Sequence, residues 1–78
     1  SKDGVAMNTL KELRNFRQNL RNLKADNLRA MRYYEREYGQ QDSVANFMSG
    51  MAKGKTAPLM TLDHIIKRLE LEEEYGNA

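Results

Sequence analysis

An uninterrupted stretch without glycine or proline runs from Val5 to Tyr38 and constrains this chain more than any other feature. Glycine and proline are the strongest breakers of helices, so their absence favours helix throughout the stretch. Apolar residues recur there at three- and four-residue steps, which is the spacing of an amphipathic helix. These residues are Leu10, Leu13, Phe16, Leu20 and Leu23. We therefore expect an all-α fold.

Two arrangements of this stretch are open. The spacing continues through Asn27, Ala30 and Tyr34, which predicts a single helix from about 8 to 38. Asp26 and Asn27 compete with the helical backbone and favour N-cap positions, which predicts a break near Asp26 and a second helix after it. Of the two arrangements, we favour the break.

Glycine and capping residues mark the next helix. Gly39 suits the left-handed position that follows a helix, and Asp42 or Ser43 can cap the helix that comes after it. This helix is expected to end near residues 53–55, where Gly54 again stands at a helix end. Its apolar face consists of Val44, Phe47, Met48 and Met51.

Proline marks the last boundary. Thr56-Ala57-Pro58 is expected to form a turn, because Pro58 lacks a backbone donor and biases its neighbour toward extended geometry. A last apolar helix then opens at Pro58 or Thr61. The sequence thus predicts a small single-domain protein of three to five helices.

Composition bounds the function. The chain has 78 residues, which make at most one domain, with no cysteine, no tryptophan and one histidine. These residue types exclude a disulfide framework, a zinc-thiolate site and a thiol nucleophile, and they make an enzyme, a metal site or a cofactor unexpected. No apolar run approaches the length of a membrane span. We expect a cytoplasmic protein without catalytic activity.

The chain divides into three parts. Residues 1–6 precede Met7, the expected native start, and are interpreted as an added segment that is not native. Residues 7–75 form the helical domain, and residues 76–78 are expected to fray.

Basic residues concentrate in the first half of the chain. Residues 1–38 contain nine Lys and Arg against five Asp and Glu, whereas residues 39–78 contain four against six. Arg14, Arg17 and Arg21 lie on one helix face together with Lys24. Such a stripe can neutralise phosphates, and it can equally be a solvated polar face.

A family resemblance covers residues 40–69. The segment from Met48 to Lys55 reads Met-Ser-Gly-Met-Ala-Lys-Gly-Lys, and it resembles the end of the recognition helix in the Cro and lambda-repressor helix-turn-helix family. The segment from Ala57 to Leu69 is similar to the turn and helix that follow in that family. The resemblance implies a rearranged helix-turn-helix bundle.

The resemblance also implies a mechanism. A recognition helix at 43–51 would lie in the major groove, where Gln and Asn side chains read base edges. The implied base contacts are Gln41, Ser43 and Asn46, and the implied phosphate contacts are Ser49, Lys53 and Lys55, with Arg14, Arg17 and Arg21 on the basic stripe. The implied function is a small DNA-binding transcriptional regulator of the kind that phages and mobile elements carry.

A protein-interaction module is the alternative function. A seam with 3-4 spacing predicts a partner or homodimer interface, with Asn27 at an inner position that can fix the register of a coiled coil. The interface residues are Leu13, Phe16, Leu20, Leu23, Asn27 and Tyr34. Such a module would be an antirepressor or inhibitor with an acidic protein partner. A third interpretation is an RNA-binding helix at 14–32.

Two smaller groups have weaker interpretations. Tyr33, Tyr34 and Tyr38 are interleaved with arginines, which suits stacking on bases, anchoring of a protein interface or a half-buried core. Asp63 and His64 are adjacent on a helix, so their side chains do not face each other, and we expect no catalytic or metal site there.

Overall fold

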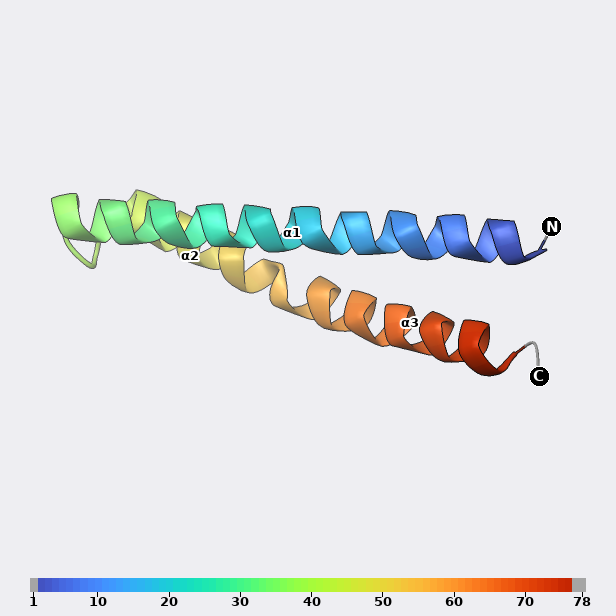
Figure 1. The fold of residues 1–78 in the computed structure, drawn as a ribbon. Helices are drawn as coiled ribbons and strands as arrows, with labels where there is room; N and C mark the ends of the chain where they lie inside the picture. The colour runs from blue at the N-terminus through green and yellow to red at the C-terminus, as the bar shows by residue number, and fades with distance from the viewer. Residues whose placement is uncertain (1, 77–78) are drawn as a thin grey trace.

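The protein folds into a long hairpin of two helical arms (Figure 1). The computed structural model describes residues 2–76, with side chains from Met7 onward, and contains α1 (Lys2–Tyr38), α2 (Ser43–Gly54) and α3 (Thr56–Tyr75). Helix α1 is the first arm, and α2 and α3 form the second arm, which bends at Lys55. The hairpin measures 58 × 16 × 12 Å. Two arms that pack side by side along one seam make a single layer.

The all-α class is confirmed, but the predicted bundle of three to five helices is wrong, because α2 and α3 form one bent helical arm. The described residues form two arms, one of them bent, rather than a bundle of three to five helices. A helix-turn-helix joins its two helices by a turn of three or four residues and crosses them steeply. Here only Lys55 separates α2 from α3, and the second arm runs antiparallel to α1.

Helix α1 continues through the predicted break near Asp26, so the favoured arrangement is wrong. The Asp26 carboxylate pairs with Arg29 one turn later and caps no backbone group. The side chain of Asn27 bonds across the hairpin to Lys55 instead of to its own backbone. Both side chains that favour a break are therefore used in contacts that need the continuous helix.

The turn between the arms follows the predicted local signals. Gly39 has a φ of +98°, which only glycine adopts without strain, and its N–H donates to the Glu35 carbonyl at 2.9 Å. Asp42 is the N-cap of α2 and accepts a hydrogen bond from the Ala45 N–H at 3.0 Å. The predicted helix end at Gly39 is confirmed, and of the two predicted caps, Asp42 and Ser43, the structure uses Asp42.

Pro58 does not make a turn, in contrast to the prediction. Helix α3 begins at Thr56, so Pro58 is its third residue. The N–H groups of the first turn have no partner within the helix, so proline removes nothing there. The Leu59 N–H makes the next bond, to the Lys55 carbonyl at 3.1 Å. The chain therefore bends at Lys55 and continues as a helix.

The arms meet along a seam with heptad spacing. Every seam side chain is buried or half-buried. On α1 the seam residues are Leu10, Leu13, Arg17, Leu20, Lys24, Asn27, Met31 and Tyr34; on the second arm they are Ala45, Met48, Ala52, Lys55, Leu59, Leu62, Ile66 and Leu69. This 3-4 alternation continues across the bend, and it is the spacing that keeps one helix facing another.

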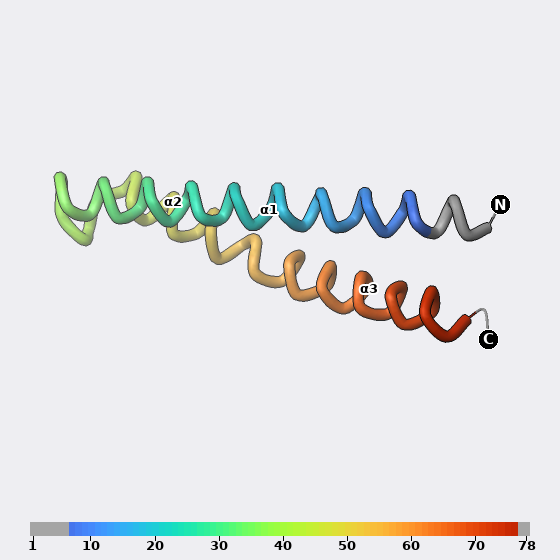
Figure 2. Tube along the Cα trace, viewed as in Figure 1, coloured from blue at the N-terminus to red at the C-terminus, as the bar shows by residue number. Residues whose placement is uncertain are grey.

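Side-chain size along the seam explains how the arms separate. Ala45 and Ala52 are buried near the turn, where small side chains let the two helices approach closely. Leu62 and Ile66, with Leu10 of α1, fill the seam toward the chain ends. Accordingly, α3 diverges from α1 toward the termini, as the tube in Figure 2 shows.

Candidate interaction surfaces

One side of the seam is closed by polar contacts between the arms. Arg17 and Arg21 both reach the Asp63 carboxylate, at 2.9 and 3.3 Å. Arg14 pairs with Glu70 at 3.3 Å. The Lys24 ammonium donates to the Thr56 hydroxyl at 3.1 Å. We call this side the bridged flank; it consists of Arg14, Arg17, Arg21, Lys24, Thr56, Asp63 and Glu70. Arg17 and Lys24 belong to the seam as well, because their stems lie in it and their charged groups reach this side.

The bridged flank contains the three arginines that were expected to contact phosphates. Their guanidinium groups face carboxylates of α3, and the Arg17 side chain retains only 22% of its exposure. Exposed ion pairs contribute little stability each, so the contacts mainly orient the two arms. The basic stripe is therefore the complement of acidic positions on α3, a role that the sequence analysis did not assign to it.

A polar node connects α1 to the bend. The Lys55 ammonium donates to the Asn27 side-chain carbonyl at 2.7 Å and to the Met51 backbone carbonyl at 3.2 Å. The Asn27 amide in turn lies 3.9 Å from the Met48 sulfur. Asn27, expected at a dimer interface, thus has intramolecular partners, and Lys55, expected on phosphate, is half-buried against α1.

The other residues of the implied DNA site lie around the turn and on α2. Gln41 is in the turn and Ser43 is the first residue of α2, and both are exposed. Asn46 and Lys53 are exposed on α2, whereas Ser49 is half-buried beside the seam. Ser43, Asn46, Ser49 and Lys53 share α2, but among the described residues α2 is followed by α3 after Lys55 alone, without the turn of a helix-turn-helix.

The opposite side of the seam is apolar. Phe16 and Leu23 lie seven residues apart on α1 and are 54% and 51% exposed. Val44, Met51 and Ile65 lie at seven- and fourteen-residue steps on the second arm, and all three are exposed. In antiparallel helices, the positions across the seam from the bridged flank lie on one common face. We call this face the apolar flank; it consists of Phe16, Leu23, Val44, Met51 and Ile65.

The expected interface residues therefore fall into two groups. Leu13, Leu20 and Tyr34 lie on the seam with Asn27, whereas Phe16 and Leu23 lie on the apolar flank. Val44, Met51 and Ile65 were not among the interface residues predicted from the sequence. A signal for them was present, because residues 44, 51, 58 and 65 are all uncharged and seven apart.

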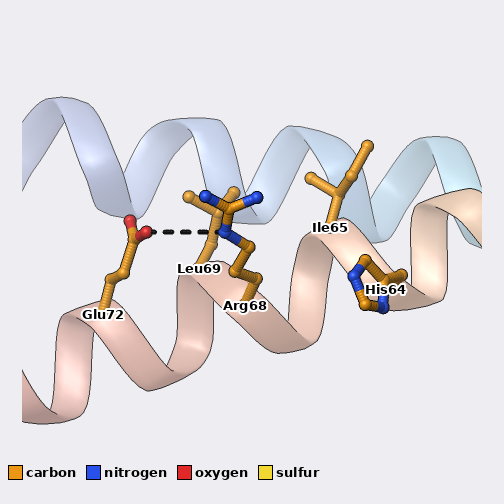
Figure 3. Close-up of a pocket in the computed structure, with 5 residues that line it drawn as sticks. All are labelled: His64, Ile65, Arg68, Leu69 and Glu72. Atoms are coloured by element: carbon orange, nitrogen blue, oxygen red, sulfur yellow. Dashed lines mark ion pairs between the residues drawn. The ribbon is translucent and has the colours of Figure 1, made fainter.

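A shallow groove lies on α3 beside the apolar flank. It is lined by His64, Ile65, Arg68, Leu69 and Glu72. In Figure 3, Ile65 stands toward α1, and Arg68 pairs with Glu72 at 3.9 Å along α3. This set contains two apolar side chains and three polar or charged ones, and it includes no nucleophile paired with a base.

The tyrosines pack on one another near the turn. The Tyr33 and Tyr34 rings are edge-to-face with centroids 5.3 Å apart, and the Tyr34 and Tyr38 rings stack at 5.7 Å. Tyr34 is half-buried on the seam, while Tyr33 and Tyr38 are exposed. The cluster covers the turn end of the hairpin.

Residues 2–76 contain neither a metal-ligand cluster nor a membrane-spanning helix. No group of three or more His, Asp or Glu residues there is arranged to hold a metal ion. None of the described helices is long and apolar enough to cross a membrane. Comparison with protein-family models, with curated proteins and with solved structures gave no match for this chain.

Proposed function

We propose that the protein is a helical protein-interaction module that binds its partner through the apolar flank. The large surface of the hairpin supports this proposal. The chain exposes 6107 Å², against about 4,900 Å² for a compact monomer of 9.1 kDa. Its radius of gyration is 17.5 Å, against about 11.5 Å for a compact chain of 78 residues.

The apolar side chains on the exposed surface also support the proposal. Large apolar side chains that are normally buried stay in water, and five of them gather on one face as the apolar flank. Contiguous apolar patches on small proteins mark interaction sites. The fully buried core consists of Leu10, Ala45, Ala52, Leu62 and Ile66 alone among the described residues. A partner on the apolar flank would supply the burial that the hairpin lacks.

A DNA-binding regulator is less well supported by this geometry. Arg14, Arg17 and Arg21 would have to leave Asp63 and Glu70 before they could neutralise phosphates. Lys55 would likewise have to leave Asn27. Duplex binding stays a prediction, and it defines the competing outcome of the test below.

Site-specific photo-crosslinking in cells tests the proposal. A photoreactive amino acid at Leu23 lies on the apolar flank, and the same group at Ala25 lies on an exposed position of α1 away from it. We expect protein adducts from the Leu23 position and few from the Ala25 position. Equal yields from both positions would contradict the proposal.

Fluorescence anisotropy of a labelled duplex provides the counter-test. A module without DNA binding leaves the anisotropy unchanged even at low salt. Micromolar affinity that falls steeply with salt, and that is lost when Lys53 is changed to Ala, would instead support the DNA-binding regulator.

A further inference from the structure

We infer that the occupant of the apolar flank is a second copy of this chain, so that two hairpins stack face to face into a four-helix bundle. The inference rests on the proposed function and names its partner. It follows from the single layer of the hairpin, from the pattern of its apolar flank, from the area available and from the placement of charge.

The hairpin supplies only one of the two layers that a core needs. Its two arms pack side by side along a single seam (Figure 1). Stable domains enclose a core between two packed layers of secondary structure. The seam residues are buried between the two arms. The apolar flank is not covered by any described residue. A second helical layer would complete the core.

The spacing of the apolar flank fits helices that lie along the hairpin. Its positions recur every seven residues on both arms, and no charged residue interrupts them. The full series is Thr9, Phe16, Leu23 and Ala30 on α1 and Val44, Met51, Pro58 and Ile65 on the second arm. A second copy presents the same uncharged series at the same spacing, so the two series can lie along each other about a two-fold axis, as in an isologous interface.

The apolar flank supplies about half of the area that each partner of a stable dimer buries. Taking about 200 Å² for a fully exposed large side chain, the five residues of the apolar flank offer roughly 400 Å² of apolar surface. A standard interface covers about 800 Å² on each partner, and side chains beside the flank can supply the remainder.

The charges of the bridged flank do not oppose this pairing. Arg14, Arg21, Asp63 and Glu70 are on the bridged flank, across the seam from the apolar flank. Two copies can thus meet without bringing these like charges together. A strongly acidic or basic partner, by contrast, would find no charged residue to pair with along the flank series.

Sedimentation of the purified chain tests the inference. We expect a mass of twice 9.1 kDa at micromolar concentration. Met51→Glu places a charge on the apolar flank, whereas Met60→Glu places it at a 68% exposed position outside the flank. Because each dimer buries two copies of the new charge, Met51→Glu should weaken association about 100-fold or more. Met60→Glu should leave association unchanged.

Circular dichroism shows whether each variant keeps its helices, and Leu23→Glu repeats the test on α1 if Met51→Glu loses them. A wild-type monomer over the whole concentration range would overturn the inference, as would a dimer that Met51→Glu and Leu23→Glu leave intact. A monomer whose Leu23 position still crosslinks a different protein in cells would overturn the second copy alone. A monomer with no such crosslinks would overturn the proposed function as well.

Discussion

The two flanks of the hairpin lie on the same two arms, and both follow the seven-residue spacing of the seam, yet they differ in how their side chains are satisfied. On the bridged flank, arginines of α1 meet Asp63 and Glu70 of α3. On the apolar flank, Phe16 and Leu23 of α1 stay exposed. Ion pairs between the arms therefore satisfy the bridged flank within the chain, whereas the apolar flank stays accessible to a partner.

Ile65 and Ile66 give the strongest test of this difference, because adjacent residues have opposite environments. Ile66 is fully buried in the seam, and Ile65 is 40% exposed on the apolar flank. Ile66→Ala should lower the free energy of unfolding by about 2–4 kcal/mol at every protein concentration, since it leaves a cavity. Urea denaturation followed by circular dichroism measures the change.

Ile65→Ala is the matched control. It should have a small effect in dilute protein and a larger effect at concentrations where the chain associates, because partner burial then adds to stability. Equal losses from the two substitutions at low concentration would show that the apolar flank is part of the monomer core and would remove the contrast between the flanks.

Substitutions in the turn between the arms should change stability by an intermediate amount. The turn sets the register of the two arms, and this register places the two flanks on opposite faces. Asp42→Ala removes the N-cap of α2 and should cost about 1 kcal/mol of stability. Ser43→Ala, at the next residue, changes an exposed hydroxyl outside the cap and should cost less. Thermal unfolding compares the two variants. A larger loss from Ser43→Ala would mean that the cap is assigned to the wrong residue.

Local signals predicted the fold only where the responsible contacts are local. Gly39 and Asp42 act on groups within four residues, and both predictions hold. Asp26 and Pro58 carry equally strong local signals for a break and a turn, but both residues lie within helices. The contact that retains Asn27 in α1 comes from Lys55, 28 residues away. No local pattern contains that information.

The candidate site was harder to predict because two apolar lines run side by side on α1. Leu13 and Leu20 belong to the seam, whereas Phe16 and Leu23 belong to the apolar flank, and the sequence shows them as one stripe. Arg17 lies on the seam, yet its charge suggested a solvent-facing position. Only the position of the second arm separates the two lines, since it determines which side chains lose contact with water.

The smallest expected effect concerns the bridged flank itself. Arg17→Met keeps most of the half-buried stem and removes the charge, while Asp63→Asn removes the opposite charge. In a double-mutant cycle, the coupling between these residues should be about 0.5–1 kcal/mol at low salt, because Asp63 is half exposed. The coupling should shrink as salt is added, since screening weakens exposed pairs.

Arg32→Met is the control for that cycle, because Arg32 is exposed on α1 outside the bridged flank. Its coupling to Asp63→Asn should be near zero at every salt concentration. A coupling between Arg17 and Asp63 that is equally small would mean that the arms are held by the seam alone. The arginines could then exchange Asp63 for a phosphate at little cost in free energy. The difference between the bridged flank and the apolar flank would no longer favour protein binding over DNA binding.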